Sequence, residues 1–189
     1  GTFFEMGCFS MYPAKVMTSG EGGFIVTNNK KLRDKLLMIR NHGMLKGYDT
    51  RLLGLNLRLP EINAAIATVQ MKKLPKFLKT REKNAKLLSK LLSKSNLDLP
   101  LERKNENVNW YLYTVTTPKR NMLLKKLNAK GIGAASYYPI PVHKTPFYKS
   151  KTKLPITDWA ASSVLSLPIH PKVTTKNIEF IAKTISEVL

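Results

Sequence analysis

Short apolar segments with turn residues at their ends alternate with amphipathic helical stretches along this chain. The segment GFIV at residues 23–26 follows a glycine-rich turn and is typical of a strand. Similar compositions predict further strands at residues 9–12, 110–116 and 132–138. Strands that are interleaved with helices in this way predict an α/β fold.

Apolar residues at helical spacing predict the helices. One helix of about ten residues follows the N-cap candidates at residues 27–29, and Gly43 is expected at its left-handed C′ position. A long helical stretch starts at Pro60 and continues to about Leu92, with Pro75 expected to kink or break it. Shorter helices are expected at residues 118–130, at residues 158–165, and after Thr174 or Thr175.

The charge of the chain limits the kinds of partner that it favours. It has 32 Lys and Arg against 12 Asp and Glu, which gives a net charge of +20 at pH 7 over 189 residues. Such an excess favours anionic partners, whether nucleic acid, a membrane surface or phosphorylated small molecules. Lysines gather on one face of the long helical stretch: Lys72, Lys76, Lys79, Lys83, Lys86, Lys90 and Lys94. A solvated helix face explains this run as well as a binding surface does.

Several classes of protein and site are excluded or disfavoured. With Cys8 as the single cysteine, the chain has no internal disulfide framework and no zinc site of the two-cysteine kind. His42, His143 and His170 are far apart in sequence, so no metal site is predicted. No apolar run approaches the length of a membrane span. A cytoplasmic protein is therefore expected.

The placement of Lys15 is the most informative local feature of the sequence. At the average frequency of basic residues, 32 in 189, the first 29 positions would hold about five, but they hold Lys15 alone. Its neighbours, MYPA before it and VM after it, are mostly apolar. Apolar surroundings favour the neutral amine, which is the form needed for nucleophilic or Schiff-base chemistry. The alternative is a lysine whose stem lies on apolar surface while its amine reaches water.

Several motifs agree with the first interpretation. The stretch FSMYPAK at residues 9–15 is followed by GEGG at residues 20–23, and RNHG, LGLNLR, YYPIPVH and LSLP come later in the chain. Glu61, Ala64, Ala65 and Gln70 follow LGLNLR. In this order and spacing, the motifs resemble those of the DegT/DnrJ/EryC1/StrS family of sugar aminotransferases, which use pyridoxal 5′-phosphate (PLP). The glycines of GEGG are expected to form a tight turn, because their spacing is not that of a phosphate-binding loop.

The resemblance implies a fold and a division into domains. The fold is that of the PLP-dependent aspartate aminotransferases (fold type I). Residues 1–75 correspond to the remainder of the PLP-binding large domain, residues 76–107 to a connecting helix and linker, and residues 108–189 to the small C-terminal α/β domain. The chain resembles only the later half of such proteins. It is therefore expected to be a fragment or a truncated homologue that lacks the acidic partner of the pyridine nitrogen.

The resemblance also assigns roles to single residues. Lys15 corresponds to the catalytic lysine that binds PLP covalently through its amine. Ser10 corresponds to a ligand of the cofactor phosphate, and Asn56 to a residue that reaches the same phosphate from the other subunit, which implies a homodimer with shared sites. Arg58 is expected to steady this loop or to meet substrate phosphates, and His143 to contact a nucleotide diphosphate. For Ser10, Asn56, Arg58 and His143, ordinary strand or loop positions are the alternative.

The implied activity is the transfer of an amino group, with glutamate as the expected donor, to a keto group on a nucleotide-linked sugar. Such reactions serve polysaccharide or antibiotic sugar biosynthesis. Two alternatives remain open from the sequence. One is a basic nucleic-acid-binding or regulatory protein that uses the lysine face, which the absence of interleaved aromatic residues disfavours. The other is a non-catalytic remnant of the aminotransferase fold.

Overall fold

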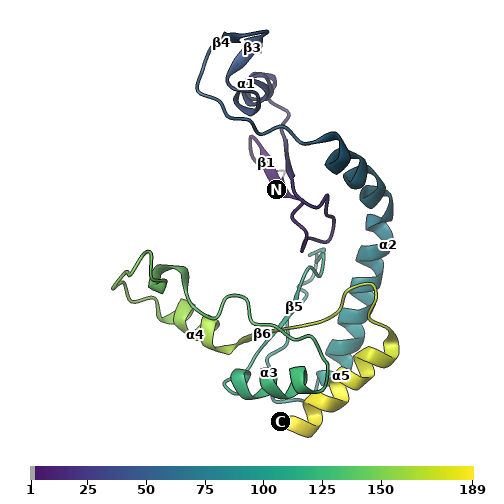
Figure 1. The fold of residues 1–189 in the computed structure, drawn as a ribbon. Coiled ribbons are helices and arrows are strands. Elements are labelled where there is room, and N and C mark those ends of the chain that lie inside the picture. The colour runs from purple at the N-terminus through teal and green to yellow at the C-terminus, as the bar shows by residue number, and fades with distance from the viewer. Residues whose placement is uncertain (1–2) are drawn as a thin grey trace. The chain divides into compact units, whose positions relative to one another are not determined.

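The structure, a computed structural model, describes residues 3–189 and divides the chain into two compact units, Gly1–Pro75 and Lys76–Leu189 (Figure 1). In the first unit, β1 (Gly7–Ser10) pairs antiparallel with β2 (Gly23–Val26), with Ser10 opposite Gly23. The predicted strand at residues 23–26 is confirmed, whereas the strand predicted at residues 9–12 lies earlier in the chain.

Helix α1 (Lys30–Arg40) has a side-chain cap at its N-terminus and a left-handed turn at its C-terminus. The Asn29 side chain accepts a hydrogen bond from the Leu32 amide, as the sequence predicts. At the other end, His42 takes the first left-handed position with φ 57°, and Gly43 follows with φ 74°. The prediction that Gly43 occupies C′ is therefore wrong by one residue. The Gly43 amide closes the helix end on the Met38 carbonyl at 2.8 Å.

A hairpin and a long helix complete the first unit. β3 (Met44–Lys46) pairs antiparallel with β4 (Asp49–Thr50), and α1 packs against β3. Helix α2 (Glu61–Leu92) begins in this unit and runs without a break through Pro75. A proline removes one backbone donor from a helix, but here that loss does not end it. Of the two outcomes expected at Pro75, the break is therefore wrong, and the kink stays a prediction.

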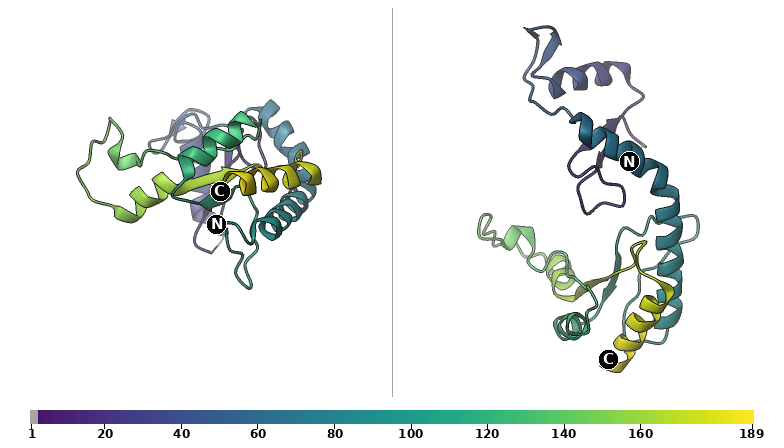
Figure 2. Two further views of the ribbon diagram at one scale, coloured as in Figure 1. Left: turned by 90° about the horizontal axis from the view of Figure 1, so that it is seen from below. Right: turned by 45° about the vertical axis from the view of Figure 1, so that its right-hand side comes forward.

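The second unit contains the hydrophobic core. β5 (Tyr113–Thr116) pairs antiparallel with β6 (Val164–Leu167), and α3 (Arg120–Ala129) packs against β6 and α5 (Thr175–Val188). Figure 1 and Figure 2 show α5 beside the C-terminal part of α2, and buried side chains of both helices join one cluster with the strands.

The connection between α3 and α5 differs from the prediction. It contains a short 3₁₀ helix (Val142–Lys144), then α4 (Pro155–Ser163), and then β6. Residues 132–138 form no strand, since only Ala135 pairs, in an isolated bridge with Ser166. Residues 164 and 165, expected in a helix, belong to β6. Periodicity alone does not separate a short buried strand from the end of a helix.

Burial differs sharply between the units. In the second unit Tyr113, Leu88 and Ile178 are completely buried. In the first unit α1 has no buried residue, and every residue of β2 is exposed. Because burial of apolar surface is the main stabilising term in folding, most of the chain's internal stabilisation comes from the second unit.

The described residues 3–189 contain no helix long and apolar enough to cross a membrane. Over the same range, no group of three or more His, Cys, Asp or Glu side chains is arranged to hold a metal ion.

Asn84 joins α2 to the loop after β6. Its side chain is 3% exposed, and its Nδ2 donates to the carbonyls of Ile169 (3.3 Å) and Val173 (2.9 Å). We expect Asn84→Ala to lower the free energy of unfolding by about 1–3 kcal/mol, because two buried carbonyls lose their donor. Denaturant unfolding followed by the fluorescence of buried Trp110 measures this loss. Asn128→Ala, on an exposed face of α3, is the control, and an equal loss in both variants would contradict the role of Asn84.

His170 makes the stability depend on pH. Partial burial and the nearby charge of Arg81 lower the pKa of His170. Between this lowered pKa and the ordinary value of about 6.5, the unfolded chain therefore binds a proton at His170 more fully than the folded chain does. We expect the free energy of unfolding to fall as the pH drops from about 7 through this range, and to fall less steeply in His170→Gln. If the free energy of unfolding changed with pH equally steeply in the parent protein and in His170→Gln, this effect of His170 would be contradicted.

Candidate active site

The segment that carries Lys15 is a closed loop, here called the Lys15 loop (residues 11–22). Both backbone groups of Met11 close it: the Met11 amide donates to the Gly22 carbonyl at 2.9 Å, and the Met11 carbonyl accepts from the Ser19 amide at 3.0 Å. The Thr18 hydroxyl donates to the same carbonyl at 3.1 Å. The two ends of the loop are thus bonded directly beyond the β1–β2 pair.

The glycine-rich end of this loop forms a tight turn. Gly20 and Gly22 have φ values of 83° and 144°, which confirms the expected positive φ for these two GEGG glycines, whereas Gly23 begins β2. A Cβ on Gly22 would lie 2.6 Å from Cδ1 of Leu59 and 2.9 Å from the hydroxyl of Ser19. Ser19 itself is fully buried, and its hydroxyl donates to the Glu21 carbonyl. No side chain larger than hydrogen fits at position 22 without a shift of its neighbours.

Lys15 and Ser10 lie on opposite sides of Met11 in sequence. Lys15 is half-buried, and its amide donates to the Tyr12 carbonyl at 3.0 Å, which forms a turn over residues 12–15. Ser10 ends β1, and its Oγ accepts from the Tyr12 amide at 3.2 Å. The accepting role leaves the Ser10 O–H available as a donor. The structure thus places two of the three predicted cofactor ligands, Lys15 and Ser10, in one continuous hydrogen-bonded segment.

The segment with Asn56 and Arg58 lies against the C-terminal end of α1. Asn56 forms an isolated antiparallel bridge with Asn41, and its side chain is exposed. Arg58 donates from Nη1 to Oδ1 of Asn41 at 2.5 Å. Of the two roles expected for Arg58, the structure supports steadying of this loop, and a contact with substrate phosphates stays a prediction.

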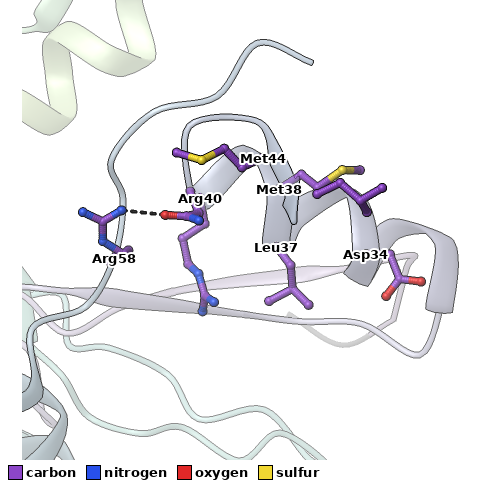
Figure 3. Close-up of a pocket in the computed structure, with 8 residues that line it drawn as sticks. Asp34, Leu37, Met38, Arg40, Met44 and Arg58 are labelled. Carbon is purple, nitrogen blue, oxygen red and sulfur yellow. Dashed lines mark hydrogen bonds between the residues drawn. The ribbon is translucent and has the colours of Figure 1, made fainter. Parts of the chain in front are cut away.

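Two clefts border this region of the first unit. One, of about 440 Å³, is lined by Arg40 and Arg58 together with α1 and β3 side chains (Figure 3). Its lining holds two guanidinium groups and one carboxylate, that of Asp34, which is paired with Arg33, so the cleft is suited to an anionic group. The other, of about 710 Å³, includes Arg58, Asn63 and the glycines at positions 22 and 23 in its lining. Lys15, Ser10 and Asn56 line neither of these two clefts.

His143 belongs to the second unit. It is half-buried within the 3₁₀ helix, and its backbone carbonyl accepts from the Ser150 amide at 2.8 Å. Its Nε2 atom is buried without a hydrogen-bond partner in the described part of the chain. These contacts do not test the expected contact of His143 with a nucleotide diphosphate, which stays a prediction.

Sequence reasoning missed the residues that hold the Lys15 loop from outside. Asn63, on the first turn of α2, donates from Nδ2 to the carbonyls of Ser19 (2.7 Å) and Glu21 (3.1 Å). An amide side chain in the first turn of a helix indicates a capping role and gives no hint of a partner more than 40 residues earlier. Only the folded structure reveals this contact.

Comparisons with known proteins agree on one family. The sequence profile of the DegT/DnrJ/EryC1/StrS aminotransferase family matches residues 1–186. The chain belongs to this family. Of the curated members, the UDP-N-acetyl-3-dehydro-alpha-D-glucosamine 3-aminotransferase of Acidithiobacillus ferrooxidans is 33% identical over 192 residues, covering 100% of this chain and 52% of the relative. A pleiotropic regulatory protein of Geobacillus stearothermophilus is 33% identical over 187 residues, covering 95% and 50%.

Solved structures of family members share the fold. An aminotransferase of the family from Brucella abortus superposes with a TM-score of 0.92 at 29% identity, covering 99% of this chain and 52% of that protein. DesV of S. venezuelae, solved in complex with a ketimine intermediate, gives a TM-score of 0.92 at 31% identity, covering 96% and 51%. The expected aminotransferase fold is confirmed. The chain spans about half the length of the relatives that it matches. The three-part domain division stays a prediction.

Gly43 fixes the path of the segment that contains Asn56. A Cβ at this position would lie 1.7 Å from the Leu52 carbonyl oxygen, in addition to the strain of φ 74°. Gly47 has a similar φ of 58° but open space around it. We expect Gly47→Ala to cost about 1–2 kcal/mol, the penalty of a left-handed alanine. Gly43→Ala should cost clearly more and speed amide exchange over residues 51–57, and equal effects of the two substitutions would refute the role of this close approach.

Proposed function

We propose that the protein acts as a PLP-dependent aminotransferase with Lys15 as its catalytic residue. The observation that carries the proposal is the placement of a half-buried lysine in a closed loop directly after β1. Membership of the aminotransferase family supports it. Relatives that are named as transaminases of UDP- and dTDP-linked sugars support it further.

The residues of the Lys15 loop fit the chemistry of this cofactor. PLP, when bound, supplies an electron sink for the carbon atom that carries the amino group. The Lys15 amine is suited to condense with the cofactor aldehyde and, once released, to move a proton at the substrate carbon. The Ser10 hydroxyl, held by the Tyr12 amide, is suited to donate to a phosphate oxygen.

The proposed substrate is a nucleotide-linked keto sugar, and the proposed amino donor is an amino acid, most simply glutamate. The net charge of +20 favours a diphosphate-bearing substrate. Arg58 and Arg40, on one cleft, are positioned to attract an anionic part of such a ligand. His143 is proposed as a further contact of the nucleotide diphosphate.

Asn56 leads to a proposal about assembly. Its exposed side chain lies on the segment that is bonded to the end of α1, so it can meet a group outside its own unit. We propose that Asn56 reaches the cofactor phosphate of a second subunit in a homodimer with shared sites.

A cytoplasmic location is also proposed, because the substrates and the cofactor of such a reaction are soluble small molecules.

Covalent trapping tests the proposal. Incubation with PLP followed by borohydride should add the reduced cofactor to the protein, and peptide mapping should place the added mass on Lys15. Lys15→Ala should abolish this site-specific label and, in a transaminase assay, lower turnover by several orders of magnitude. Lys30→Ala, at an exposed position of α1, is the matched control and should keep both the label on Lys15 and the turnover of the parent protein. A label that spreads over surface lysines, unchanged by Lys15→Ala, would refute the assignment.

A further inference from the structure

We propose that Asn63 is a positioning residue for Lys15, which acts by holding the side of the Lys15 loop opposite to the lysine. This inference rests on the proposed role of Lys15. Asn63 is the third residue of α2, and its Nδ2 donates to the carbonyls of Ser19 at 2.7 Å and Glu21 at 3.1 Å. One amide group therefore bridges the two peptide carbonyls on either side of Gly20.

The backbone of this turn lies in contact with the Asn63 amide. Gly20 has φ 83°, and a Cβ built on it would lie 3.5 Å from Nδ2 of Asn63. The backbone thus passes directly against the amide. Ser19 is fully buried, so a displaced carbonyl at this position would lose its donor without free access to water. Both facts tie the position of residues 19–21 to the start of α2.

The position of these residues is passed on to Lys15 through Met11. The Ser19 amide donates to the Met11 carbonyl, and the Met11 amide donates to the carbonyl of Gly22, the next residue after Glu21. Met11 is 3% exposed and stands between Ser10 and the turn that contains Lys15. A shift of the turn that Asn63 holds therefore moves the common base of Ser10 and Lys15. The two hydrogen bonds of Asn63 go to the carbonyls of Ser19 and Glu21, so its proposed role is to position Lys15 and Ser10 and not to take part in the chemistry.

Asn63→Asp separates this role from a contribution to helix stability. Aspartate has the same shape but no N–H donor, and its carboxylate would face two carbonyl oxygens. A negative charge in the first turn of a helix is favourable, so α2 should keep its helix content in this variant. Asn63→Ala removes the donor without the repulsion, in case the aspartate variant fails to fold. Gln70→Glu makes the same amide-to-acid change later in α2 and is the control.

Amide hydrogen exchange of the full chain gives the first result. We expect the amides of Met11 and Ser19 to exchange about tenfold faster or more in Asn63→Asp and Asn63→Ala, since each removes two hydrogen bonds from the loop. In Gln70→Glu the same two amides should exchange as slowly as in the unsubstituted protein. Unchanged exchange in both Asn63 variants would overturn the inference.

The rate of borohydride-trapped labelling of Lys15 at saturating PLP gives the second result. It should fall severalfold in Asn63→Asp and recover in part in Asn63→Gln, which keeps the amide donor. Faster exchange with labelling at the parent's rate would overturn the positioning role. A parent protein that gains no label contradicts the proposed function instead, and the exchange result then decides alone whether Asn63 holds the loop.

Discussion

The hydrogen bonds of Met11 are the constraint on which the candidate site depends. This one residue bonds through its amide to Gly22 and through its carbonyl to Ser19, so the chain leaves β1 and returns to β2 within a closed loop. Lys15 and Ser10 are held by this closure, and Asn63 fixes it to α2. A lysine that must meet one atom of a cofactor needs such a base, because a free side chain of this length has many rotamers.

The two units use different physical means to keep their shape. The second unit buries Tyr113, Leu88 and their neighbours in a continuous apolar cluster, and buried Asn84 satisfies two carbonyls there. The first unit buries little of its apolar surface, and its proposed site residues are held by backbone and side-chain hydrogen bonds. Each such bond contributes modestly to the net free energy, but loss of a donor that leaves buried carbonyls unpaired costs more, so we expect Asn63 to have a large local effect.

Local signals in the sequence predict the elements whose cause is local. The strand at residues 23–26 and a helix cap among residues 27–29 both follow from residue types at fixed spacing, and the structure confirms them, with Asn29 as the cap. The sequence misplaces features that depend on distant partners. Residues 132–138, for example, form no strand, because pairing with β6 is limited to the bridge between Ala135 and Ser166. In the same way, motif resemblance predicts Lys15 and Ser10 as site residues, whereas the contact of Asn63 with Ser19 joins positions 44 residues apart and has no signature in either segment.

The central claim is that the end of β1 and the Lys15 loop, joined at Met11, present the Ser10 hydroxyl and the Lys15 amine to the same cofactor. A crystal structure of the protein after reaction with PLP and reduction tests it most directly. The account predicts continuous density from Nζ of Lys15 to the cofactor ring, with the phosphate within hydrogen-bond distance of Oγ of Ser10. A cofactor attached to another lysine, or a phosphate turned away from Ser10 while Lys15 is modified, would contradict it.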